Sequence, residues 1–287
     1  MMTLEQLRIF VAVAEREHLT KAADALNLTP SAVSSAIRVL EERYGIALFH
    51  RTGRRIELTE TGEAFLPEAR ATLVRAGSAD LFLTEISGLK RGTLTLAASQ
   101  TVAGYWLPPR LMLFRQTYPA IDIRMTVGNT DETAEAVLDG RAELGFVEGE
   151  IDHPALARRV VARDRVVIVA PSGHPLAGKP DIDAEDLTAA RWVLREPGSG
   201  TRRALTAALP EEGLNIVLSL PSNEAVRSAV LAGQALTAVS EFVVEDDLAA
   251  DRMARIAFEL PERAFGLLRH KERYRSRASL AFEALLA

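Results

Sequence analysis

The sequence predicts an α/β protein in which a small, mainly helical amino-terminal domain is followed by one long helix and then by a larger module of two α/β lobes. Apolar residues recur at three- and four-residue spacing within residues 1–48, an amphipathic helical pattern covers residues 61–89, and short apolar strands alternate with helical segments after Gly92. The predicted domains are 1–60, 61–91 and 92–287, and the last divides into lobe I (about 92–164 and 265–287) and lobe II (about 165–264).

Composition excludes several classes of protein. The chain has 287 residues, of which 48% are hydrophobic and 25% charged, as in ordinary globular proteins. It contains no cysteine, so disulfides, thiolate nucleophiles and thiolate metal sites are excluded. A net charge of -5 argues against wholesale attraction to membranes or nucleic acid, so any DNA contact must be local. Glu5 interrupts the start of the chain, and no apolar run reaches roughly eighteen residues, so we expect a cytoplasmic protein without a membrane partner.

Three short helices are predicted in residues 1–48. Thr20 is the predicted cap of the second helix, which ends near Asn27. Thr29 and Pro30 begin the third, because threonine caps helices and proline fits the first helical position. The residues expected to face the core are Leu4, Leu7, Val11 and Ala14 in the first helix, Ala22, Ala23 and Leu26 in the second, and Val33, Ile37 and Leu40 in the third.

A basic hairpin is predicted after Gly45, where two extended stretches flank Thr52 and Gly53 in the run LFHRTGRRIELT. Residues 31–55 hold five arginines and two glutamates, a local positive surplus that suits phosphate contacts. The order of a capped turn, a polar third helix and a basic hairpin is that of a winged helix-turn-helix. The alternative is a merely solvated surface. The candidate DNA-binding residues are Thr20, Lys21, Thr29, Pro30, Ser31, Ser34, Ser35, Arg38, Arg51, Arg54 and Arg55.

The run LTKAADALNLTPSAVSSAIRVLEERYGIALFHRTGRRIELTETGEAF closely resembles the amino-terminal signature of LysR-type transcriptional regulators, and the rest of the chain fits their effector-binding region. The resemblance implies double-stranded operator DNA as a partner, an effector cleft between two lobes shaped like a periplasmic binding protein, and RNA polymerase as a candidate partner. It also implies a homodimer through the long helix, commonly doubled to a homotetramer. Thr29 stands where members often carry glutamine, so their operator contact is not transferred to this position. The segments RGTLTLAASQT, PSGHPLA and REPGSGTR are most similar to members that govern sulfur or carbon assimilation.

Polar residues follow the predicted strands of the two lobes. In open α/β lobes, ligands bind beyond the carboxyl ends of the strands, so these residues are the candidates for an effector site. Hydroxyls and free amides suit a small anion or carboxylate, with Arg195 or Arg202 to balance its charge. The alternative is that Ser99, Thr130 and Asn223 only cap helices. The candidate effector-binding residues are Ser99, Gln100, Thr101, Thr130, Glu148, Arg195, Ser199, Thr201, Arg202, Asn223 and Ser240.

The sequence does not indicate an enzyme. The five histidines, at positions 18, 50, 153, 174 and 270, show no metal-ligand spacing and no pairing with a nucleophile, so no catalytic residue, metal or cofactor is expected. The segment from Gly198 to Thr201 lacks the lysine and the spacing of a phosphate-binding P-loop. The alternative function is that of a cytoplasmic solute-type binding protein without a gene-regulatory role. Residues 93–287 alone would resemble one, but the first sixty residues weigh against it.

Overall fold

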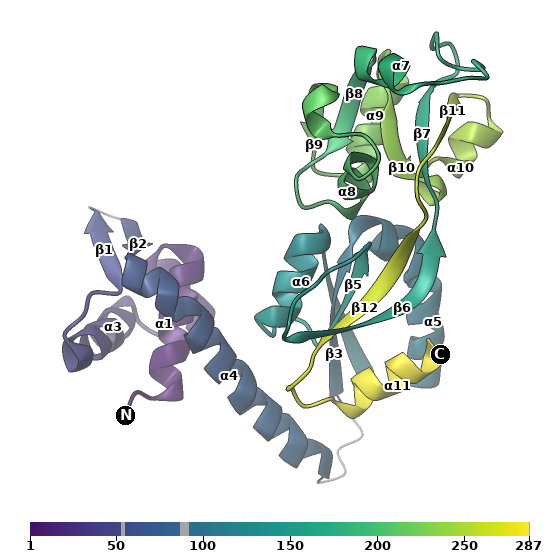
Figure 1. The fold of residues 1–287 in the computed structure, drawn as a ribbon. Coiled ribbons are helices and arrows are strands. Elements are labelled where there is room, and N and C mark those ends of the chain that lie inside the picture. The colour runs from purple at the N-terminus through teal and green to yellow at the C-terminus, as the bar shows by residue number, and fades with distance from the viewer. Residues whose placement is uncertain (53–54, 87–91, 287) are drawn as a thin grey trace. The chain divides into compact units, whose positions relative to one another are not determined.

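The computed structural model describes residues 1–52, 55–86 and 92–286 and divides into two compact units, Met1–Gly88 and Leu89–Ala287 (Figure 1). Within the described residues, no helix is long and apolar enough to cross a membrane. The first unit consists of α1 (Leu4–Arg16), α2 (Leu19–Leu26), α3 (Pro30–Tyr44), β1 (Phe49–Thr52), β2 (Arg55–Leu58) and α4 (Glu60–Ile86).

Capping residues decide where the short helices begin. Thr29 accepts a hydrogen bond from the Ala32 amide and Pro30 opens α3, as predicted. The prediction that Thr20 caps α2 is wrong, because α2 begins one residue before it and its cap is His18. The His18 ring Nδ1 accepts a hydrogen bond from the Lys21 amide at 3.4 Å, which leaves Thr20 exposed in the first turn.

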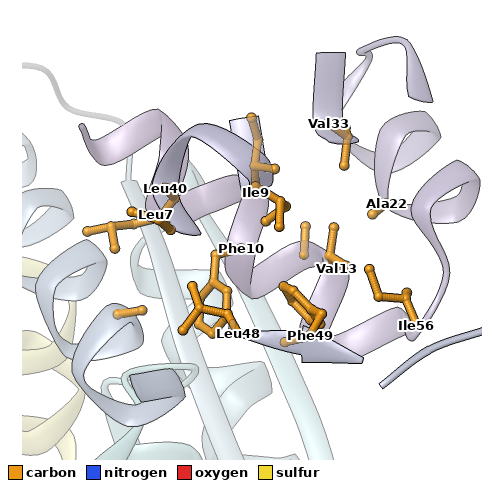
Figure 2. Close-up of a cluster of buried hydrophobic side chains, with 14 of the residues drawn as sticks. Leu7, Ile9, Phe10, Val13, Ala22, Val33, Leu40, Leu48, Phe49 and Ile56 are labelled. Atoms are coloured by element: carbon orange, nitrogen blue, oxygen red, sulfur yellow. The ribbon is translucent and has the colours of Figure 1, made fainter. Parts of the chain in front are cut away.

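The core of the first unit lies between α1, α2, α3 and the hairpin (Figure 2). Phe10 is fully buried and its ring packs against Phe49 and Phe65. The predicted inward residues of α3 are buried, and Leu7 and Ala14 of α1 are buried as well. Leu4 is 49% exposed, so its assignment to the core is wrong. Val11 and Leu26 are partly buried against this core.

The first half of the long helix α4 packs on this core. Ala69 is buried, and Leu66 and Leu73 pack partly buried beside it. Leu83, in the second half of the same helix, is 66% exposed. The structure describes the helix as far as Ile86, and the predicted extension to Leu89 lies outside the described residues.

Lobe I of the second unit is a five-stranded sheet with helices packed against it (Figure 1). The strand order is β4-β3-β5-β12-β6, with β4, β3 and β5 parallel and β12 antiparallel to both of its neighbours. Its elements are β3 (Gly92–Ser99), a π-helical turn η1 (Val102–Trp106), α5 (Pro108–Thr117), β4 (Ile121–Gly128), α6 (Thr130–Leu138), β5 (Leu144–Glu148), β6 (Leu156–Asp164), β12 (Arg263–His270) and α11 (Arg277–Leu285).

Lobe II contains two small sheets, the antiparallel β10-β7-β11 and the parallel pair β8-β9. Trp192 is fully buried in its core. Its elements are β7 (Val166–Pro171), α7 (Ala184–Ala189), β8 (Arg191–Arg195), α8 (Gly200–Thr206), the 3-10 turn η2 (Glu211–Gly213), β9 (Asn215–Leu220), α9 (Asn223–Ala232), β10 (Thr237–Ser240), α10 (Glu241–Ala249) and β11 (Met253–Glu259).

The chain passes between the lobes twice, from β6 into β7 and from β11 into β12 (Figure 1). Strands β3, β4 and β5, which the sequence predicts to alternate with helices, are parallel to one another, as are β8 and β9, whereas the crossover strands pair antiparallel with their neighbours. A strand that continues directly from one lobe into the other enters the second sheet from the opposite end. Asp164 and Arg263 stand opposite each other in the strand register at this point.

Candidate DNA-binding surface and interlobe site

The leading end of α3 presents short polar side chains to solvent. Pro30, Ser31, Ser35 and Arg38 are exposed, and Ser34 is partly buried. The Thr29 hydroxyl is already used, because it accepts the Ala32 amide at 3.2 Å and lies 3.0 Å from the Ser31 hydroxyl. Thr20 and Lys21 are exposed at the start of α2. This surface of the first unit has the small hydroxyl and basic groups that fit a major groove.

The hairpin is fixed to α3 by a glutamate. The Glu41 carboxylate accepts hydrogen bonds from the amides of Leu48 at 2.8 Å and Phe49 at 3.2 Å. Glu41, one of the two glutamates within residues 31–55, thus has its carboxylate hydrogen-bonded inside the domain. Strands β1 and β2 pair from Phe49 opposite Leu58 to Thr52 opposite Arg55, so Arg51 and Arg55 lie on the two strands. Arg54 lies outside the described residues.

In the second unit, the two lobes meet around the carboxylate of Glu148, which is 2% exposed. Glu148 ends β5 of lobe I, and the Thr101 amide of the same lobe donates to it at 3.0 Å. The Thr201 hydroxyl of lobe II donates to the other carboxylate oxygen at 3.0 Å. Thr101 and Thr201, predicted from the ends of separate strands, therefore both donate to Glu148, a third predicted residue.

Arg263 and Asp164 complete this cluster from the crossover strands. Arg263 Nη1 donates to Glu148 at 2.6 Å and to the Thr201 hydroxyl at 2.9 Å, and Arg263 Nε donates to Asp164 at 2.6 Å. The Ser240 hydroxyl donates to the second Asp164 oxygen at 2.7 Å. Arg263 and Asp164 were not among the predicted site residues. The signal that the sequence offered is a charged residue beside an apolar strand at each crossover. Asp164 ends β6 just before β7, and Arg263 begins β12.

Burial and pairing act in opposite directions on these carboxyl groups. Burial favours the neutral acid at Glu148, but Arg263 and the hydrogen bonds from Thr101 and Thr201 outweigh it and lower the Glu148 pKa. Among the described residues, the buried Ser99 hydroxyl has no hydrogen-bond partner. The Asp164 pKa is raised by burial and by the neighbouring Glu148 charge, which Arg263 and Ser240 offset only partly.

A second set of hydrogen bonds joins the lobes at α9. The Gln100 amide group donates to the Pro221 carbonyl at 2.6 Å and accepts the Asn223 backbone amide at 3.0 Å. The Asn223 side chain donates to the Thr101 hydroxyl at 3.1 Å and accepts Arg195 Nη1 at 2.6 Å. Thus Gln100, Thr101, Asn223 and Arg195 form one connected network across the two lobes.

The remaining predicted residues lie around or outside this network. Thr130 is buried, with its hydroxyl 3.4 Å from the Glu148 backbone, and Ser199 is buried just before α8. The Arg202 guanidinium donates to the Glu211 carboxylate from Nε and Nη2 and to the Arg195 carbonyl from Nη1 at 2.8 Å. The two arginines predicted to balance a ligand charge are therefore both paired with carboxylates, Arg195 with Glu196 and Arg202 with Glu211.

Two glycines allow the close approach of the lobes. A Cβ on Gly200 would lie 2.5 Å from the Glu148 carbonyl oxygen and 2.6 Å from the Glu148 Cβ. Gly198 has φ +86°, a conformation that side chains disfavour, and its carbonyl faces the Asp131 amide at 3.4 Å. These positions explain both glycines of the GSGT segment by backbone packing between lobes. Within the described residues, no cluster of histidine or acidic side chains has the arrangement of a metal site.

Two family models match the chain. The model described as "Bacterial regulatory helix-turn-helix protein, lysR family" matches residues 4–63, and "LysR substrate binding domain" matches residues 87–287. The HTH-type transcriptional regulator YeiE of Escherichia coli K12 is 34% identical, over 98% of this chain and 95% of YeiE. CysL of Bacillus subtilis is 34% identical, over 86% of this chain and 83% of CysL. A RuBisCO operon transcriptional regulator of Allochromatium vinosum is 32% identical, over 91% of this chain and 87% of that protein.

Solved structures agree with these relatives. Full-length CbnR in complex with its target DNA is 25% identical with a TM-score of 0.67, and the alignment covers 99% of both chains. The regulatory domain of CcmR from Synechocystis PCC6803, in complex with 2-PG, is 26% identical with a TM-score of 0.62 and covers 68% of this chain and 96% of that domain. The predicted fold and the resemblance to sulfur- and carbon-related regulators are thus confirmed, and nothing supports a solute-binding protein without a regulatory role.

Proposed function

The chain is a DNA-binding transcriptional regulator of the LysR family, and we propose that the exposed face of α3 reads its operator while a small effector binds between the two lobes. One observation carries the effector site. Asn223 of lobe II and Thr101 of lobe I are directly hydrogen-bonded, so a ligand that separates or replaces this contact changes the relation of the lobes. The relatives are regulators, and we propose no enzymatic activity for this chain.

The DNA-binding proposal assigns different roles to the helix and the hairpin. Ser31 is exposed at the leading end of α3, where a hydroxyl can contact base edges. The wing arginines are proposed to contact phosphates, which position the protein without reading sequence. In vitro selection from a random duplex library is the test: Ser31→Ala should change the enriched sequence. Arg54→Ala should weaken binding to all sequences alike and reduce the salt slope by about one unit. A sequence-selective effect of Arg54→Ala would reverse these roles.

The proposed effector is a small anion or carboxylate. The support is chemical: the loops at the lobe interface supply hydroxyls and amides, and the similar domain of CcmR was solved with 2-PG. Thermal-shift titration against a panel of small anions tests it, since a ligand that binds only the folded state stabilises it. Thr101→Ala should abolish a shift given by the wild-type protein. Arg202→Ala should leave the shift intact if the Arg202–Glu211 pair keeps this side chain out of the site.

We also propose a homodimer formed through α4, with a homotetramer as the larger assembly. Leu83 is 66% exposed on this helix, and an exposed leucine on a long amphipathic helix is typical of a surface that pairs with another helix. Sedimentation velocity of Leu83→Glu should show a lighter species than the wild-type protein. A cytoplasmic location and contact with RNA polymerase follow from the family and are proposed on that ground alone.

Effector and DNA are proposed to act on each other through the two-lobed unit. A coupling of about 1–3 kcal/mol between the sites is enough to switch a regulator. Since coupling is reciprocal, the effector affinity should change when operator DNA is present. Equal effector affinity with and without DNA would exclude this mechanism.

A further inference from the structure

Three hydrogen-bond donors from three separate elements converge on the carboxylate of Glu148. They are the Thr101 amide after β3, the Thr201 hydroxyl of α8 and the Arg263 guanidinium at the start of β12, at 3.0, 3.0 and 2.6 Å. The first belongs to lobe I, the second to lobe II and the third to a crossover strand. A backbone amide, a hydroxyl and a guanidinium are the donor set that proteins use to bind an oxyanion.

This donor set lies where an open α/β module places a ligand, beyond the carboxyl ends of β3 and β5. Its acceptor, however, is a side chain of the protein itself. A further carboxylate or oxyanion cannot take these donors while Glu148 holds them, because all three are already directed at the Glu148 carboxylate and a third buried negative charge would join Glu148 and Asp164 around the Arg263 guanidinium. The anion position and the Glu148 carboxylate therefore exclude each other.

We infer that Glu148 is an internal anion that occupies the oxyanion position of the interlobe site, so that an anionic ligand binds there only by displacing its carboxylate. The inference rests on the proposed effector site and identifies the residue that sets its selectivity. A ligand without a negative charge at this position meets no such competition. An anion must offset the loss of the internal contacts, and its affinity is lowered accordingly.

A purely structural ion pair does not account for this arrangement. Arg263 already has a buried counter-charge in Asp164, which accepts its Nε at 2.6 Å. Glu148 adds a second carboxylate to a single cation, which leaves the buried cluster with one excess negative charge. Removal of Glu148 leaves Arg263 paired with Asp164, so Glu148→Ala should fold and expose the three donors to a ligand.

Acetate is the probe, because it replaces the carboxylate that Glu148→Ala removes, and acetamide is its uncharged control. In the full-length Glu148→Ala protein, acetate should bind saturably, raise the melting temperature and shift the Thr101 amide resonance, and acetamide should do none of these. The wild-type protein should bind acetate ~10-fold more weakly or worse, which corresponds to about 1.4 kcal/mol. Glu148→Gln keeps the side-chain volume but removes the negative charge, so it should bind acetate more tightly than the wild-type protein and less tightly than Glu148→Ala.

Two results would overturn the inference: equal acetate affinity in the wild-type and Glu148→Ala proteins, or no acetate effect at Thr101 in Glu148→Ala. Should Glu148→Ala fail to fold, titration of the wild-type protein with acetate decides, since a saturable shift of its Thr101 amide at low concentration contradicts an occupied position. Failure of the proposed function looks different. In that case no effector candidate shifts the wild-type Thr101 or Asn223 amides, while Glu148→Ala still gains acetate binding.

Discussion

Replacement of Arg263 by methionine should destabilise the second unit severely. Arg263 has a side chain that is 4% exposed, and it separates two buried carboxylates, Glu148 and Asp164. Methionine retains much of the packing volume but removes the cation that both carboxylates share. Breaking a buried ion pair by removal of one partner costs about 3–5 kcal/mol, a large part of the ~5–15 kcal/mol that keeps a typical domain folded.

Urea denaturation followed by tryptophan fluorescence measures this loss directly. The chain has two tryptophans, and both report on the second unit: Trp106 is in lobe I and Trp192 in lobe II. The matched control is Arg203→Met, which removes the Arg203–Asp131 pair between the same lobes. That pair is 42% and 49% exposed, so its loss should cost less than about 1 kcal/mol.

The pH dependence gives a second signature of the same variant. In the wild-type protein the Glu148 pKa is lowered, so its contribution to stability is present at neutral pH and is lost as pH falls through the folded-state pKa. Without Arg263, burial raises the carboxyl pKa values above those of the unfolded chain, so protonation favours the folded variant as pH falls. The stability difference should therefore shrink in acid. An Arg263→Met protein within about 1 kcal/mol of the wild type at neutral pH, or a deficit that is constant with pH, would refute this reasoning.

Three further outcomes are expected. Gly200→Ala should cost about 1–3 kcal/mol in urea denaturation of the second unit, because its Cβ would lie 2.5 Å from the Glu148 carbonyl oxygen; an unchanged midpoint would mean that the lobes separate freely. Thr29→Ala should lower the calorimetric stability of the first unit by about 1 kcal/mol through loss of the α3 cap, whereas Thr29→Ser should retain it. Burial lowers the His174 pKa, so protonation opposes folding and the wild-type protein should lose stability as pH falls below the usual histidine range. His174→Gln should flatten that acid limb, and equal limbs would show that His174 does not contribute.

Most strands were predictable because their apolar runs are continuous and bounded by turns. The crossover strands β6 and β12 were missed, since arginines interrupt the apolar residues of LARRVVARD, and the short apolar run of RAFGLLRH contains a glycine and has an arginine on each side. The Thr20 cap was a local error of another kind. Threonine is the better cap by type, but the His18 ring Nδ1 reaches the Lys21 amide, and the helix begins at Leu19. Capping propensity identifies the residue types that cap helices. Which of two nearby residues caps α2 depends on where the folded chain begins the helix.

The interlobe site shows the same limit at the level of function. Strand ends in the sequence identify Thr101, Glu148, Thr201 and Asn223, and the structure does bring these residues into contact. The sequence cannot show which of them are donors to a ligand and which are acceptors within the protein, because that depends on Arg263, which is 115 residues away from Glu148 along the chain. With Arg263 in place, Glu148 is an internal anion of the protein and not one more polar contact for a ligand. The charge expected of an effector therefore depends on whether Glu148 keeps its position, which is set by tertiary contacts with Thr101, Thr201 and Arg263.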